Sequence, residues 1–124
     1  MTVTMKKVLI IDDDSRNIFA LQAVLKAKGF NCLTATGARE GIDLLTKQNE
    51  VSIVLLDMMM PDMDGYEALK EIRDGAHKAI PVIAVTAQAM VGDREKCLEA
   101  GANDYISKPI DVDQLLSVLQ RFVK

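Results

Sequence analysis

The chain has 124 residues, of which 49% are hydrophobic and 27% charged, and its formal net charge is −3. This composition is typical of one globular domain and excludes a disordered or fibrous chain, and the slightly acidic balance argues against non-specific nucleic-acid binding. No apolar run is long enough to span a membrane, and the first residues, MTVTMKK, lack the apolar segment of a signal peptide. The two cysteines stand at no metal-binding spacing, so we expect a reducing, cytoplasmic location.

Apolar runs alternate with amphipathic segments along the whole chain. The apolar runs are short and rich in Val and Ile, which favours strands, and the amphipathic segments carry apolar residues at helical spacing. In chain order, the predicted elements are a strand at 7–11, a helix at 15–28, a strand at 31–35, a helix at 38–48, a strand at 51–56, a helix at 65–73, a strand at 81–86, a helix at 90–100, a strand at 104–107 and a helix at 111–122. Gly29 and Gly101 stand where the first and fourth helices are expected to stop.

This alternation of strands and helices predicts an α/β fold with a parallel sheet and helices on both faces. The chain is too short for an eight-stranded barrel, so we expect an open, doubly wound (βα)5 sheet. Its expected strand order, 2-1-3-4-5, is that of the flavodoxin-like members of this fold class and does not come from the residues themselves. The sequence contains no internal repeat or linker, and the last predicted helix runs almost to the final residue. We therefore expect a single domain over residues 1–124, without an effector domain.

Acidic side chains stand at the carboxyl ends of two strands of this predicted sheet. Asp12, Asp13 and Asp14 follow the first strand, and Asp57 follows the third. In the order 2-1-3-4-5 these two strands are neighbours, and doubly wound sheets bind ligands beyond such strand ends. A carboxylate at the tip of a buried strand is unfavourable unless something binds it. The pattern predicts a ligand site at Asp12, Asp13 and Asp57, whereas Asp14 is expected to start the first helix together with Ser15.

Two further strand ends supply a hydroxyl and an amine. Thr86 ends the fourth strand, and Lys108 follows the fifth. Clustered carboxylates repel, by about 4 kcal/mol for two charges about 4 Å apart at an effective dielectric constant of 20, and a hard divalent cation relieves this repulsion. Mg²⁺ prefers oxygen ligands of this kind, with Mn²⁺ as an alternative ion. A carboxylate can also act as a nucleophile and form an aspartyl phosphate, with Mg²⁺ and Lys108 offsetting the charge of the transferring group.

The segments at these strand ends resemble the receiver domain of two-component response regulators, the CheY-like family. The four segments that carry the resemblance are VLIIDDDS, IVLLDMMMPDMDG, VIAVTA and DYISKP, and together they extend over essentially the whole chain. The resemblance implies a phosphorylation-activated switch rather than an enzyme. Such a switch receives its phosphoryl group from a histidine kinase or a histidine phosphotransfer protein, and it assists its own phosphorylation and dephosphorylation. An alternative within the family is a receiver excised from a hybrid histidine kinase, acting as a phosphorelay intermediate.

The resemblance also implies a role for each site residue. Asp57 would be the phosphoacceptor, and the expected metal ligands are Asp12, Asp13, Asp57 and the backbone carbonyl of Met59. The residues expected to bind the phosphoryl group or to switch with it are Thr86, Ala87, Tyr105 and Lys108. The peptide bond before Pro109 is expected to be cis. The expected output face consists of the fourth helix, fifth strand and fifth helix, roughly residues 90–122, and it is expected to bind another protein. The domain is expected to be a monomer or a phosphorylation-dependent dimer. Direct contact with nucleic acid or membrane is not expected.

One segment, MPDMDGYEALKE, also matches a calcium-binding pattern. Asp62, Asp64, Gly65 and Glu71 occupy four positions of an EF-hand loop. The first ligand position, however, is Met60, and the stretch from Gly65 onwards predicts a helix. We therefore expect a turn at Asp62, with Asp64 capping the helix that follows. The letters DMDG also resemble the nucleophile motif of haloacid dehalogenases, but that motif directly follows a strand.

Two other functions fit parts of the pattern. A hydrolase could use the same aspartyl phosphate, although no substrate-binding segment or cap domain is evident. A binding module could act without phosphorylation, although the intact Asp57, Thr86 and Lys108 argue against it. Each of these residues alone would be ordinary, and the functional interpretation rests on their combination. His77 lies in a polar loop and is expected to be solvated rather than to carry a phosphoryl group.

Overall fold

One parallel five-stranded sheet organises the computed structural model, which describes residues 7–47, 50–75, 79–87 and 92–122. The strand order is β2-β1-β3-β4-β5, which confirms the prediction. The strands are β1 (Lys7–Ile11), β2 (Asn31–Ala35), β3 (Val51–Asp57), β4 (Val82–Thr86) and β5 (Asp104–Ser107). The helices between and after them are α1 (Ser15–Ala27), α2 (Ala38–Lys47), α3 (Gly65–Asp74), α4 (Asp93–Glu99) and α5 (Val112–Phe122).

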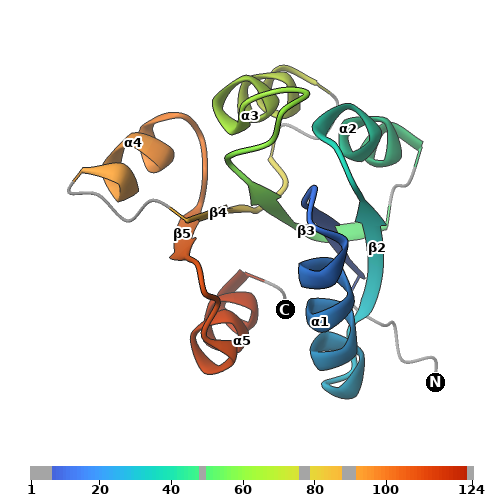
Figure 1. Cartoon of the computed structure of the whole chain (residues 1–124). Helices are drawn as coiled ribbons and strands as arrows, with labels where there is room; N and C mark the ends of the chain where they lie inside the picture. The colour runs from blue at the N-terminus through green and yellow to red at the C-terminus, as the bar shows by residue number, and fades with distance from the viewer. Residues whose placement is uncertain (1–6, 48–49, 76–78, 88–91, 123–124) are drawn as a thin grey trace.

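Helices cover both faces of the sheet (Figure 1). The period-2 alternation of the strands divides the core into two clusters. Val8 and Ile10 of β1 pack with α1 and α5, while Leu9 and Ile11 pack with α2, α3 and α4. The central strands β3 and β4 alternate in the same way, so they are apolar on both faces, as expected for a buried parallel sheet.

Helix ends follow the sequence signals with small differences. The Asp14 carboxylate accepts hydrogen bonds from the backbone N–H groups of Arg16 and Asn17 and caps α1, as predicted. The fourth helix was predicted from residue 90 to residue 100, but α4 covers Asp93–Glu99. It begins only after Gly92, whose φ of +91° lies outside the helical region. Residues 90 and 91 lie outside the described part of the chain.

The ends of β3 and β4 also differ from the prediction by one residue. Asp57 is the last residue of β3 rather than the residue after it, because it pairs with Val85 and the Met58 N–H donates to the Val85 carbonyl at 2.9 Å. Pro81 lies outside β4 because it has no N–H to donate, although its carbonyl accepts from the Val54 N–H. The extra pairing holds the backbone of Asp57 in the sheet and therefore fixes where its carboxylate emerges.

Candidate functional site

Three carboxylates meet at the carboxyl edge of β1 and β3. Ile11 of β1 pairs with Leu56 of β3, so the residues that follow, Asp12 and Asp57, emerge side by side. One oxygen each from Asp12, Asp13 and Asp57 lie within 4.8 Å of one another. Asp12 and Asp57 are each 3% exposed, while Asp13 is exposed to solvent. The arrangement is the acidic pocket that the sequence predicted at the neighbouring strand ends.

Neighbouring donors orient the Asp12 carboxylate. Its Oδ1 accepts from the Asp14 N–H at 2.9 Å, and its Oδ2 accepts from the Asn17 side-chain amide at 2.5 Å. Asn17 lies in the first turn of α1, which Asp14 caps. Asn17 is not among the residues predicted for this site. The available signal was its position, because a residue in the first turn of a helix that directly follows a strand can reach back to the end of that strand.

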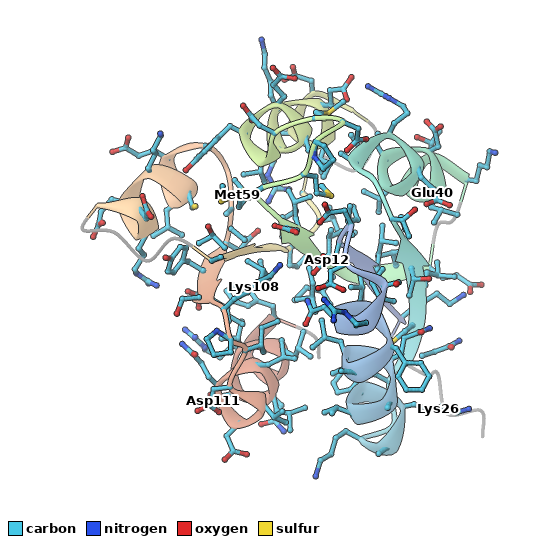
Figure 2. The ribbon with its side chains drawn as sticks, viewed as in Figure 1. Asp12, Lys26, Glu40, Met59, Lys108 and Asp111 are labelled. Atoms are coloured by element: carbon cyan, nitrogen blue, oxygen red, sulfur yellow. The ribbon has the colours of Figure 1, made fainter. Side chains whose placement is uncertain are left out.

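Lys108 is the cation of this pocket. Its Nζ lies 3.3 Å from Asp57 Oδ2 and 3.4 Å from Asp12 Oδ2, and Figure 2 shows its side chain extending from the end of β5 towards Asp12. The backbone is held close by, because the Lys108 N–H donates to the Thr86 carbonyl at 2.8 Å. The Lys108–Pro109 peptide bond is cis, as the family resemblance implied. Burial alone would lower the pKa of Lys108, but Asp12 and Asp57 outweigh it and raise that pKa.

The pKa of Asp57 is raised above its usual value. Burial is the main cause, and the neighbouring charge of Asp12 acts in the same direction. Two contacts oppose the rise: the Met59 N–H, which donates to Asp57 Oδ1 at 2.9 Å, and the ammonium group of Lys108. The ionised carboxylate is therefore only partly compensated by the protein, which leaves it able to gain from an added cation.

The other residues predicted for the site lie on β4, on β5 and in the loop after β3. Thr86 is buried at the end of β4, next to the strand that carries Asp57. Ala87 follows it and is exposed, and Met59 is exposed in the loop after β3. Tyr105 is half-buried on β5, with β4 between it and Asp57. The Tyr105 side chain packs against the cluster that contains Cys97 of α4, and burial together with the charge of Asp93 raises its pKa.

A cavity of about 230 Å³ adjoins the pocket between α3 and α4. Thr86 and Met59 form the part of its wall nearest the acids, and Tyr66 and Cys97 line it from α3 and α4. The Tyr66 hydroxyl lies 3.8 Å from the Cys97 sulfur, and burial raises the pKa of Tyr66 to about 12. The cavity therefore borders the Thr86 side of the pocket.

The acids of the calcium-like segment have separate structural roles. Asp64 caps α3 through the backbone N–H groups of its first turn, as predicted. Asp62 accepts from the N–H groups of Ala38 and Arg39 at 3.3 Å and so caps α2 from a distant loop. Glu71 forms an ion pair with Arg39 at 2.7 Å. The prediction against an EF-hand is confirmed, since these carboxylates do not converge. His77 lies outside the described residues.

Comparison with known proteins assigns this chain to a family. Residues 8–120 match the model of the response regulator receiver domain. The chain therefore belongs to the response regulator receiver domain family, the CheY-like receivers of two-component signalling.

Within the described residues, no helix has the length and apolar character needed to cross a membrane.

The most similar relatives include whole proteins that are longer than this chain. It is 37% identical over 123 residues to hybrid signal transduction histidine kinase I of Dictyostelium discoideum, covering 92% of this chain and 7% of the kinase. It is 36% identical over 118 residues to the cell cycle response regulator CtrA of Brucella abortus, covering 95% of this chain and 50% of CtrA. The chain thus spans half or less of the length of these relatives.

Solved structures agree with the fold in detail. The receiver domain of sensor histidine kinase PA1611 from Pseudomonas aeruginosa, solved with a magnesium ion coordinated in its active site cleft, is 33% identical with a TM-score of 0.86, covering 96% of this chain and 98% of that one. Chemotaxis protein CheY4 of Vibrio cholerae is 27% identical with a TM-score of 0.89, covering 97% of this chain and 100% of that one.

Proposed function

We propose that Asp57 accepts a phosphoryl group from the phosphohistidine of a histidine kinase or histidine phosphotransfer protein. The observation that carries the proposal is the position of the Asp57 carboxylate, which is buried at the end of β3 with Asp12, Asp13 and Lys108 around it. Lys108 offers an ammonium group to a phosphoryl oxygen, and the Met59 N–H orients the attacking carboxylate. The similarity to a hybrid histidine kinase supports a donor of this class.

In the proposed step, one oxygen of ionised Asp57 attacks phosphorus and an O–P bond forms. The P–N bond of the phosphoimidazole breaks, and its electron pair stays on the imidazole nitrogen, which takes a proton from solvent. The product is a mixed anhydride between Asp57 and phosphate, and no oxidation or reduction occurs. The main contribution of Lys108 is to offset negative charge on the transferring group.

The donor set of the pocket fits a magnesium ion. Three carboxylates supply oxygen atoms within 4.8 Å, and Mg²⁺ is bound by one or two carboxylates together with waters and phosphate oxygens. Asp12, Asp13, Asp57 and the backbone carbonyl of Met59 would hold it, and Mn²⁺ fits the same oxygen ligands. When bound, the ion supplies positive charge next to the phosphoryl oxygens. The magnesium ion in the PA1611 receiver domain supports this proposal.

Output is proposed to depend on three residues at the β4 and β5 side of the pocket. Thr86 and the Ala87 backbone would bind the phosphoryl group, and Tyr105 would turn inward as Thr86 moves. The face of α4, β5 and α5 would then bind another protein in the cytoplasm, with the domain as a monomer or a phosphorylation-dependent dimer.

The proposed domain spans residues 1–124, either as a separate regulator or as a receiver of a hybrid kinase. It assists both the gain and the loss of its own phosphoryl group.

Intact-mass spectrometry after incubation with acetyl phosphate tests the proposal. We expect one phosphoryl adduct in the presence of Mg²⁺, none with EDTA, and none in Asp57→Asn. Asp113→Asn is the matched control, because Asp113 is an exposed carboxylate in the first turn of α5, and it should be labelled like the unaltered protein. A short-lived adduct would escape detection, so beryllofluoride binding is measured in parallel. Absence of both the adduct and beryllofluoride binding would overturn the proposal.

A further inference from the structure

A buried carboxylate lies outside the site described above. Among the described residues, four polar or charged side chains are buried: Asp12, Asp57, Thr86 and Asp104. The first three belong to the pocket, whereas Asp104 is the first residue of β5, at the edge of the sheet, and is 4% exposed. A buried ionised carboxylate is unfavourable unless charged groups and hydrogen bonds compensate it. The partners of Asp104 therefore indicate what this residue does.

Two arginines from different helices meet at Asp104. Arg94 of α4 donates to Oδ1 at 2.9 Å, and Arg121 of α5 donates to Oδ2 at 2.7 Å. The two helices cover opposite faces of the sheet, since α4 packs in the cluster of Leu9 and α5 in that of Val8. Because β5 is an edge strand, both arginines reach the same carboxylate around the edge. One side chain thus joins two helices across the sheet.

The Asp104 carboxylate also accepts a hydrogen bond from the backbone of Tyr105, the proposed switch residue. The Tyr105 N–H donates to Asp104 Oδ1 at 2.8 Å, and this is the oxygen that Arg94 also contacts. A shift of α4 that moves Arg94 therefore alters the hydrogen bond at Tyr105. A shift of β5 at Tyr105 acts on Arg94 in the same way.

Helix α4 is short, with seven residues after Gly92, and its buried residue is Cys97. On the α3 side, the Lys96 ammonium lies 4.8 Å from the centre of the Tyr66 ring. On the β5 side, the ion pair of Arg94 with Asp104 holds it. The Asp104 carboxylate is therefore well placed to decide where α4 lies relative to β5 and α5.

We propose that Asp104 couples α4 and α5 to the backbone of Tyr105 and favours the arrangement in which Tyr105 is half-buried. Any contact that stabilises one of two arrangements opposes a ligand that prefers the other. Loss of the Asp104 contacts therefore makes the phosphorylated arrangement easier to reach. This inference rests on the proposed function, because the second arrangement is the one that phosphorylation of Asp57 selects.

The test measures the dissociation constant of beryllofluoride, a phosphoryl mimic, by titration calorimetry with Mg²⁺ present. We expect the dissociation constant of beryllofluoride to be at least fivefold lower in Asp104→Asn, Arg94→Gln and Arg121→Gln than in the unaltered protein. If Asp104 and its arginines had only a structural role, the variants would bind beryllofluoride equally well or more weakly. The direction of the change in affinity therefore separates a structural role from the proposed coupling. Arg94 and Arg121 have half-exposed side chains, so these two variants serve if Asp104→Asn does not fold.

Matched controls come from the exposed ion pair between Arg39 and Glu71 of α2 and α3. Arg39→Gln repeats the charge change of the arginine variants, and Glu71→Gln repeats that of Asp104→Asn. Both controls should bind beryllofluoride like the unaltered protein. Since Asp104→Asn and Arg94→Gln change the net charge in opposite directions, a common tightening also excludes a long-range charge effect.

Hydrogen exchange of the protein without beryllofluoride tests the coupling separately. Arg94→Gln should raise amide exchange at least twofold in α5 and β5 as well as in α4. Unchanged or weaker beryllofluoride binding in the three variants, or faster exchange confined to α4, would overturn the inference. If the unaltered protein neither binds beryllofluoride nor forms the phosphoryl adduct, the proposed function is overturned instead, and the exchange comparison still decides whether Asp104 couples the two helices.

Discussion

Lys108 and Asp57 form an ion pair across the edge of the sheet, with Nζ 3.3 Å from Oδ2, although 51 positions separate them in the sequence. The same ammonium group lies 3.4 Å from Asp12. One cation thus compensates two buried carboxylates, and the effects of altering Lys108, Asp12 and Asp57 cannot be independent.

Lys108→Gln should destabilise the domain. Without the ammonium group, two buried carboxylates face each other uncompensated, and we expect a loss of about 1–3 kcal/mol in the free energy of unfolding. Urea unfolding without Mg²⁺ measures it. The matched control is Lys7→Gln, which removes the ion pair with exposed Glu50 and should cost about 1 kcal/mol or less. The double variant Lys108→Gln, Asp57→Asn should lose less than the sum of the single changes, and strict additivity would contradict the shared compensation.

Asp57→Asn should stabilise the domain at neutral pH when Mg²⁺ is absent. Folding favours the protonated form of Asp57, because the pKa of Asp57 is raised in the folded state. This preference stabilises the fold fully below the ordinary pKa of 3.8, and the stabilisation is lost as pH rises through the folded pKa. Asparagine carries no charge at any pH and so avoids this loss, and we expect a gain of about 1 kcal/mol in the free energy of unfolding, or roughly 4 °C in Tm. Thermal unfolding between pH 3 and pH 8 checks this. The difference between the two proteins should vanish at the acid end, and a gain that is constant across the range would contradict the assignment to Asp57.

Asp13→Asn should remove stabilisation by Mg²⁺ while leaving the metal-free domain almost unchanged. Asp13 is exposed, so we expect a change of about 0.5 kcal/mol or less in the free energy of unfolding without metal. In the unaltered protein, Mg²⁺ at ten times its dissociation constant should add about 1.4 kcal/mol. Thermal unfolding with Mg²⁺ and with EDTA measures both quantities. Equal stabilisation of Asp13→Asn and the unaltered protein by Mg²⁺ would rule out Asp13 as a ligand.

Asn17→Ala should weaken Mg²⁺ binding through Asp12. The Asn17 amide holds Asp12 Oδ2 without adding a positive charge, so its loss frees the carboxylate to rotate. We expect a cost of about 1 kcal/mol in stability and a several-fold weaker affinity for Mg²⁺, measured by titration calorimetry. Gln22→Ala is the control, because it removes another half-buried amide side chain from the same helix, and it should leave the affinity for Mg²⁺ unaltered. An unchanged affinity in Asn17→Ala would show that the other contacts of Asp12 suffice to orient it.

Gly65→Ala should disturb the loop between β3 and α3. An added Cβ would lie 2.4 Å from the sulfur and 2.6 Å from the Cα of Met58, and the backbone contact cannot be relieved by a side-chain rotation. We expect a loss of about 1–3 kcal/mol in the free energy of unfolding and weaker Mg²⁺ binding, because Met59 lies in this loop. Gly75→Ala is the control, since the nearest atom to its added Cβ is 3.2 Å away. Similar losses in both variants would point to a general glycine effect.

Several long-range contacts could not be predicted from the sequence. Asp62 was expected only to form a turn, yet it caps α2, whose first residues are 24 and 23 positions away. Asp104 gave no signal in the pattern, because an acid at the start of a strand is common in any domain, and the signal of Asn17 was its position in the first turn after a strand. What gives these residues their roles is the neighbour that packing brings to them, and no periodicity encodes that neighbour.

The alternation of elements and the acidic strand ends could be predicted from the sequence, because apolar periodicity and helix caps are local signals. The strand order followed from the fold class, whose flavodoxin-like members share it. The same rules placed Asp12, Asp13 and Asp57 at neighbouring strand ends. Two relationships became visible only in the folded chain: how Asn17 orients Asp12, and that Asp104 joins α4 to α5. They depend on distances of a few ångströms between side chains that different elements carry, and close packing of the two cores sets those distances.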